Sequence, residues 1–123
     1  MKVLIDTHVF LWALSCPERL TPERRHTIAS RTNQVFLSSM SIAELMLKHA
    51  SGKIDVDFDP LAMAEQTGIQ IIDFTGADAM MLGRLPLHHR DPFDRMIISQ
   101  ALANGLPIMS DDPQFLKYDC EII

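Results

Sequence analysis

Cysteine, basic charge and long apolar runs are all scarce in this chain of 123 residues. Its two cysteines, Cys16 and Cys120, lie far apart and lack the spacing of a zinc site or a disulfide framework, so we expect reduced thiols. No apolar run approaches the roughly 18 residues that a membrane span requires. Asp6 interrupts the first apolar stretch, which argues against a secretory signal. We therefore expect a cytoplasmic protein that does not associate with membranes.

Basic residues are outnumbered by acidic ones, 11 against 16, which gives a net charge of −5. Because phosphate contacts need Lys and Arg, this balance alone does not indicate a nucleic-acid-binding protein. Eleven of the 16 acids are Asp. Asp is favoured at helix N-caps and in compact metal sites, so the positions of these residues must distinguish the two roles.

Internal repeats, low-complexity segments and long linkers are also missing, so residues 1–123 should form a single domain. The composition, 47% apolar and 22% charged, is that of a globular protein. Short apolar runs alternate with segments of helical periodicity. The pattern predicts strands at 2–6, 34–39, 69–74, 106–112 and 120–123, helices at 8–15, 22–30, 40–51, 60–68, 76–82 and 92–105, and a helical turn at 113–118.

Alternation of strands and helices implies crossover connections between parallel strands. We therefore predict an α/β fold, a three-layer α/β/α sandwich whose mostly parallel central sheet has about five strands. In such folds, ligands bind at the edge of the sheet where strands end and helices begin. The chemistry of residues at those positions is therefore informative about function.

Several acids fall at that edge. Asp6 ends the first strand, Glu44 lies early in helix 40–51, and Asp94 lies in the first turn of helix 92–105, while Asp111 and Asp112 end the strand at 106–112. Carboxylates gathered in this way repel one another unless a cation neutralises them. Oxygen ligands without Cys or His favour Mg²⁺ or Mn²⁺ over zinc. Such ions can activate water for attack on a phosphodiester.

Each of these acids also has a purely structural interpretation. Asp6 precedes Thr7 and could cap the first helix, and Asp91 and Asp112 each precede a proline, which is the signature of a helix N-cap. Glu44 lies four residues before a lysine on a helix, as in an exposed ion pair. No single acid is decisive, and only their shared edge predicts a site.

Four segments resemble the PIN domain family, in particular the VapC-like toxins of bacterial toxin–antitoxin pairs. They are VLIDTHVFLWAL, SSMSIAEL, HHRDPFDRMIISQAL and PIMSDD, and they span nearly the whole chain in order. HRDPFDR followed by an apolar helix is the most specific of them. The resemblance implies a compact α/β/α fold and an Mg²⁺- or Mn²⁺-dependent endoribonuclease acting on RNA. It also implies a small antitoxin partner that blocks the site, and a homodimer.

The resemblance assigns roles to individual residues. The family's catalytic acids match Asp6, Glu44 and Asp94, and the fourth matches Asp112 by spacing, with Asp111 as the alternative. By resemblance and chemistry together, Asp6 and Asp94 would hold the main metal, with Asp112 helping directly or through water. Glu44 would either orient the attacking water or complete a second metal site. Thr7, Ser110 and Asp91 are supporting residues, and Arg90 and Arg95 are candidate contacts for RNA.

Other functions are compatible with parts of this pattern. A haloacid-dehalogenase-type phosphotransferase needs an Asp where His8 lies, and a structure-specific DNA nuclease needs DNA-gripping additions for which the chain has no room. A receiver domain could use Asp73 as its phosphoacceptor but would need an acid pair after the first strand. A PIN-like RNA- or protein-binding module without catalysis remains the main alternative, and metal-dependent activity would distinguish it.

Overall fold

The computed structural model describes all residues from 1 to 123. Its central sheet contains the parallel strands β1 (Lys2–Ile5), β2 (Gln34–Ser38), β3 (Ile69–Ile72) and β4 (Ile108–Met109) in the order β3-β2-β1-β4. In this register Val3 pairs with Val35 and Ile5 with Met109. The apolar composition of β1 follows from its central position, because a parallel strand covered on both faces has no solvated side.

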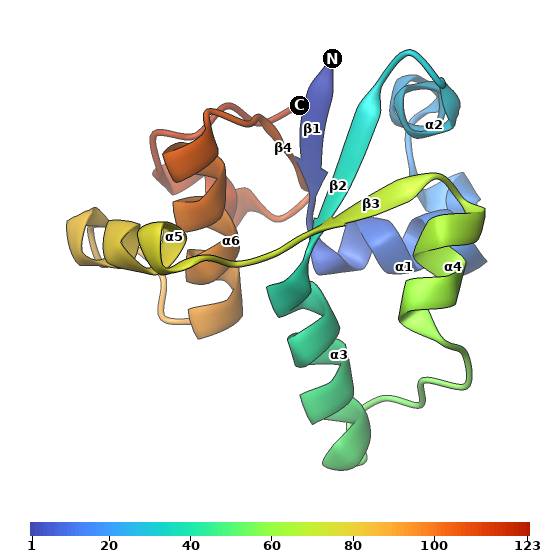
Figure 1. The fold of residues 1–123 in the computed structure, drawn as a ribbon, viewed down its shortest axis with the longest axis horizontal. Helices are drawn as coiled ribbons and strands as arrows, with labels where there is room; N and C mark the ends of the chain where they lie inside the picture. The colour runs from blue at the N-terminus through green and yellow to red at the C-terminus, as the bar shows by residue number, and fades with distance from the viewer.

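Helices cover both faces of the sheet, as Figure 1 shows, and this confirms the predicted α/β/α sandwich. The helices α1 (Thr7–Ser15), α2 (Pro22–Ala29) and α4 (Pro60–Gln66) lie on one side, whereas α5 (Gly76–Met81) and α6 (Pro92–Asn104) lie on the other. The helix α3 (Ser39–Ala50) extends from the end of β2. Three short 3-10 turns, Pro17–Arg19, Leu82–Arg84 and Pro113–Lys117, complete the secondary structure.

The core is divided by the sheet into two apolar clusters. Val3 and Ile5 pack into a cluster shared with α1, α3 and α4, whereas Leu4 packs into a cluster shared with α6 and β4. Successive side chains of a strand point to opposite faces, so β1 contributes to both clusters, as does β4 through Ile108 and Met109. Full burial of each such aliphatic side chain contributes roughly 1.5–3 kcal/mol. This anchoring fixes the position of Asp6, the residue that follows β1.

The C-terminal strands are shorter than the sequence predicts. The strand expected at 106–112 is confined to Ile108–Met109, and the strand expected at 120–123 is reduced to a single parallel bridge between Ile108 and Ile122. Pro107 has no N–H to donate, although its carbonyl accepts from the Leu4 amide at 2.9 Å. After Met109, the chain leaves the ladder because side-chain bonds from Ser110 and Asp112 replace the backbone pairing.

The edge where the strands end is also where helices begin. Asp6 caps α1, Ser38 caps α3, Asp91 caps α6, and Asp112 caps the turn Pro113–Lys117. The capping interpretation of Asp6, Asp91 and Asp112 is therefore correct, and it does not compete with their place at the edge. No helix combines the length and the apolar character that crossing a membrane requires.

Candidate metal centre

Asp6 is held rigidly at the end of β1 and is only 3% exposed. Its Oδ1 accepts a 2.7 Å hydrogen bond from the Val9 amide, and its Oδ2 accepts one of 2.5 Å from Ser110 Oγ. Burial raises the pKa of Asp6, and the nearby Asp112 carboxylate raises it further, while the two hydrogen bonds lower it. A buried carboxylate beside a second acid is a group that a cation would stabilise.

Ser110 links Asp6 to the fourth acid. While its hydroxyl donates to Asp6, it accepts a 3.1 Å hydrogen bond from the Asp112 amide, and Asp112 Oδ1 in turn accepts from the Gln114 amide at 2.9 Å. Asp111 takes a different direction, with a side chain 66% exposed and 3.3 Å from the Arg24 guanidinium. Asp112 is therefore connected to Asp6 through Ser110, whereas Asp111 forms an ion pair with Arg24.

Thr7 joins β1 to α3 beneath the edge. Its hydroxyl donates to Glu44 Oε1 at 2.7 Å and lies 2.9 Å from Ser41 Oγ. Glu44 is 3% exposed, and its other oxygen accepts a 2.6 Å bond from Lys48, which raises the pKa of that lysine. The face of α3 that carries Glu44 is therefore buried against α1 at this point and is not the exposed stripe that its spacing allows.

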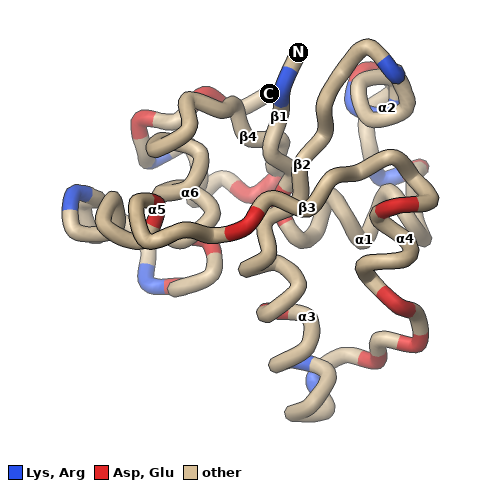
Figure 2. Tube along the Cα trace, viewed as in Figure 1, with Lys and Arg blue, Asp and Glu red and all other residues tan.

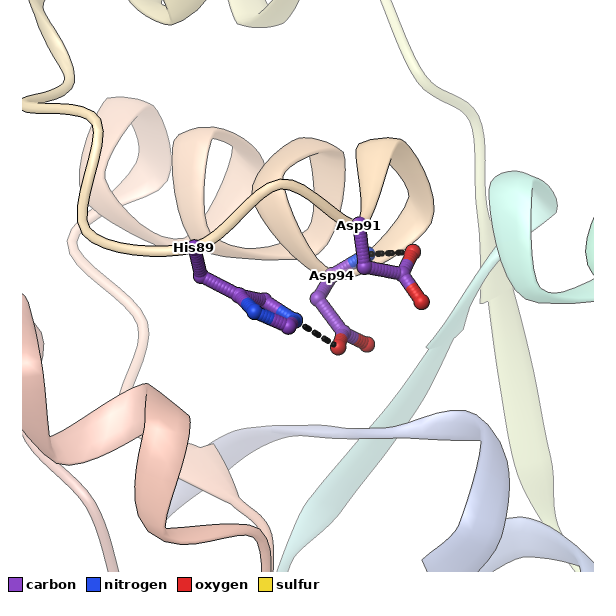
Figure 3. Close-up of side chains that lie close together, drawn as sticks. All are labelled: His89, Asp91 and Asp94. Atoms are coloured by element: carbon purple, nitrogen blue, oxygen red, sulfur yellow. Dashed lines mark hydrogen bonds and ion pairs between the residues drawn. The ribbon is translucent and has the colours of Figure 1, made fainter.

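Asp94 belongs to a separate group around the start of α6, drawn in Figure 3. Asp91 Oδ1 accepts from the amides of Phe93 and Asp94, and Asp94 Oδ2 forms a 2.9 Å hydrogen bond with His89 Nε2. Burial raises the pKa of Asp94 to about 6, with Asp91 and Glu44 adding to the effect and His89 opposing it. The influence of Glu44 shows that this group and α3 face the same region.

The acids of the edge therefore form two groups. One is Asp6 with Asp112, and the other is Asp91 with Asp94, which is electrostatically coupled to Glu44. Ligand atoms of His89, Asp91 and Asp94 all lie within 4.8 Å of one another, and no other set of three or more such residues is as compact. Carboxylates with raised pKa values are the donors expected for a hard divalent cation. The donor set therefore fits a divalent cation, and the nitrogen of His89 distinguishes it from the all-oxygen set from which Mg²⁺ or Mn²⁺ was predicted.

His89 is the residue of this group that sequence reasoning placed differently. The sequence assigns it no role in the site, whereas the structure places its ring 2.9 Å from Asp94. The loop 85–90 folds back because the Arg95 guanidinium donates to the Pro86 carbonyl at 2.9 Å and to Tyr118 Oη at 3.1 Å. No helical or strand periodicity relates a loop residue to a helix, so only the spacing of five residues before Asp94 was available as a signal.

The two candidate RNA contacts lie in different surroundings. Arg95 is occupied with the loop carbonyls and Tyr118, while Arg90 is exposed and makes no hydrogen bond or ion pair. Figure 2 shows Lys and Arg toward the outside of the trace. Acidic residues lie there too, and some of them lie near the centre of the trace, where the strands end. The roles of these arginines in RNA binding stay predictions.

Comparison with known protein families shows to which family the chain belongs. The family model of the PIN domain matches residues 3–120. The chain belongs to the PIN domain family. No curated protein matches it closely enough to count as a relative. The predicted resemblance is thereby confirmed at the level of the family.

Solved structures with the same fold come from bacteria. VapBC2 from Rickettsia felis, bound to a DNA fragment from its promoter, shares 16% identity with this PIN domain at a TM-score of 0.74, covering 100% of this chain and 98% of that one. DNA-bound VapBC from Salmonella typhimurium shares 21% identity at a TM-score of 0.71, with coverages of 100% and 97%. FitAcB from Neisseria gonorrhoeae shares 18% at 0.63, with coverages of 98% and 96%. At these identities the likeness establishes the fold.

The Ser110 hydroxyl gives a first test of the metal centre. We expect Ser110→Ala to weaken Mn²⁺ binding about 10-fold, because loss of this donor raises the pKa of Asp6 further and leaves only the Val9 amide to orient its carboxylate. Ser110→Thr keeps a hydroxyl and should retain binding. Calorimetric titration with Mn²⁺ measures the effect, and Ser99→Ala, which removes a hydroxyl bonded only to the Met96 carbonyl, is the matched control. Equal affinities in Ser110→Ala and the wild type would contradict this role.

Proposed function

We propose that this PIN domain is a metal-dependent endoribonuclease that hydrolyses RNA phosphodiester bonds and acts as the toxin of a toxin–antitoxin pair. The observation that carries the proposal is that buried and partly buried acids lie in two groups along one edge, where burial and like charge raise the pKa values of Asp6 and Asp94. No Lys or Arg pairs with either carboxylate, and only the partial charges of His8 near Asp6 and of His89 beside Asp94 oppose the rise of these pKa values, so structural ion pairs do not account for the arrangement.

Each acid has a place in the proposed mechanism. Asp6, Asp94 and Asp112 would hold the metal, which supplies a Lewis acid for the phosphodiester and lowers the pKa of a bound water. Glu44, fixed by Thr7 and Lys48, would orient the attacking water and accept its proton. Asp91 fixes the first turn of α6 by capping it, and thereby fixes Asp94. Ser110 fixes the Asp6 carboxylate by donating a hydrogen bond to its Oδ2.

The proposal includes protein partners. Solved structures of this fold include a toxin–antitoxin complex from Klebsiella pneumoniae at 16% identity and a TM-score of 0.66. On this basis we propose an antitoxin that covers the acidic edge, and a homodimer. Large apolar side chains that have no cover within the chain include Met80, Leu87 and Leu116, exposed by 79%, 70% and 69%. These exposed side chains could contribute to the proposed contacts with an antitoxin or with a second copy of the chain.

Cleavage of RNA tests the proposed activity. Purified, antitoxin-free protein should cut cellular RNA in Mg²⁺ or Mn²⁺ and should stop when EDTA is in excess, because the acids cannot polarise a phosphodiester without the cation. Electrophoresis of the RNA measures the products. Failure of folded protein to cut any RNA would favour the binding-module alternative. Asp73, the acceptor residue of the receiver alternative, is exposed at the end of the edge strand β3, and the family match gives that alternative no support.

A further inference from the structure

A hollow of about 220 Å³ lies beside the Asp6–Asp112 pair. Its lining consists of Asp6, His8, Trp12, Asp111 and Asp112. One part of the wall is therefore made of carboxylates, of which the proposed function assigns Asp6 and Asp112 to the metal, and the other part is made of two aromatic rings. An aromatic wall is not needed to hold a cation, so the hollow has a feature that the metal centre does not explain.

The aromatic wall is built by the first helix. His8 and Trp12 are four residues apart in α1, so they lie on the same helical face, and their ring centroids are 6.3 Å apart at an interplanar angle of 49°. Trp12 is partly buried and packs against the core cluster of α1, while His8 is exposed. The Arg19 guanidinium lies 5.4 Å from the centre of the Trp12 ring. The tryptophan is thus held in place by its neighbours and still borders the hollow.

We propose that this hollow binds a nucleobase of the RNA substrate, placed next to the phosphodiester that the metal centre cleaves. The inference rests on the proposed function and deepens it. Every base has a π-face that can stack on an aromatic side chain, so this contact needs no particular sequence. Trp12 and His8 line the hollow with aromatic rings, and Arg19, which lies over the Trp12 ring, adds a cation beside an otherwise acidic edge.

The negative charge of the protein favours a contact with RNA that uses base stacking. With a net charge of −5 and an acidic edge, the chain offers few cations to the RNA backbone. Stacking is a source of affinity that does not depend on neutralising phosphates. A base held against Trp12 would place its own phosphate toward Asp6 and Asp112, because these residues share the walls of one hollow.

Trp12 is the only tryptophan of the chain, so its fluorescence reports directly on the hollow. We expect AMP, added at constant Mg²⁺, to quench this emission in a saturable manner, whereas ribose phosphate, which lacks the base, should bind at least about 10-fold more weakly. AMP has no phosphodiester bond, so the titration does not require cleavage. Equal quenching by AMP and ribose phosphate would overturn the proposal.

Variants test the same contact with RNA. Trp12→Leu should raise the KM for RNA cleavage on the order of 10-fold with little change in kcat, and Trp12→Phe should restore most of the loss. His8→Ala should also raise the KM, but its kcat is not expected to stay unchanged, because His8 acts electrostatically on Asp6. His26→Ala, at an exposed position of α2 outside the hollow, is the control. Thermal unfolding shows whether each variant is folded. If Trp12→Leu and His8→Ala keep the wild-type KM but weaken a protein partner, the hollow is a protein contact and the proposal is wrong.

Failure of this inference can be told apart from failure of the proposed function. Saturable quenching by AMP in a protein that cuts no RNA would support the base site and contradict the nuclease. RNA cleavage without any quenching by AMP would do the reverse. The two measurements therefore test separate statements about neighbouring parts of the edge.

Discussion

Asp94→Asn should reduce RNA cleavage by more than about 100-fold and leave the protein folded, since loss of a residue that merely supports a ligand already costs 10–100-fold. The amide keeps the size of the side chain and can still bond His89, but it removes the charge that a divalent cation requires. Asp6→Asn should have the same effect, because an amide oxygen still accepts from the Val9 amide and preserves the cap of α1. Rates of RNA cleavage in Mn²⁺, together with circular dichroism, measure both parts of this expectation.

Asp73→Asn is the matched control for this experiment. It makes the same chemical change at an exposed position at the end of β3, outside both acidic groups. Its activity should equal that of the wild type. Wild-type activity in Asp94→Asn would remove the residue from the catalytic set, and inactivity of Asp73→Asn would show that the substitution acts through the fold.

The second large effect is on stability and comes from the pKa of Asp94. In the folded, metal-free protein this pKa is raised from 3.8 to about 6. Between these two pH values, the folded state therefore keeps a proton on Asp94 that the unfolded chain has released. Stability is therefore greatest below about pH 4 as far as this group is concerned, and falls as the pH rises through about 6. The shift corresponds to about 3 kcal/mol at 1.36 kcal/mol per pKa unit. Because the side chain is 20% exposed, we expect about 2 kcal/mol after solvent screening.

Asp94→Asn should accordingly make the metal-free protein more stable at pH 7 by about 2 kcal/mol, while it abolishes activity. Added Mn²⁺ should stabilise the wild type by about 2.7 kcal/mol at 100 times its dissociation constant, and the variant far less. This stabilisation should weaken below about pH 6, because protonated Asp94 cannot serve as a ligand. Urea unfolding at several pH values, with and without Mn²⁺, measures these differences. An equal response to Mn²⁺ in the two proteins would contradict the assignment of Asp94.

Much of the fold follows from local sequence. Apolar runs that end in polar residues gave β1, β2 and β3, and the pairs Thr21-Pro22 and Asp91-Pro92 marked the starts of α2 and α6. The two C-terminal strands were overestimated. Ile108 and Met109 are fully buried, but their burial does not require a long ladder when side chains anchor the segment instead.

The candidate site could be predicted in its acids but not in its connections. Topology brings Asp6 and Asp112 to one edge, because the parallel strands β1 and β4 end together, and Asp94 lies in the first turn of a helix that begins at this edge. The bond between His89 and Asp94 depends on how a loop folds back, which no periodicity encodes. The hollow at Trp12 was also missed, because a tryptophan at helical spacing is usually a core residue, and here it is a core residue that also borders the site.

The hydrogen bond between Ser110 and Asp6 joins residues 104 positions apart in the chain. During synthesis, Asp6 emerges from the ribosome long before its partner, and contacts of such sequence separation form late because the intervening chain must be ordered first. A nascent chain that has not reached Ser110 and Asp112 therefore contains only part of the acidic edge. For an enzyme proposed to cut RNA, this order of assembly would keep the unfinished protein harmless to the machinery that translates it.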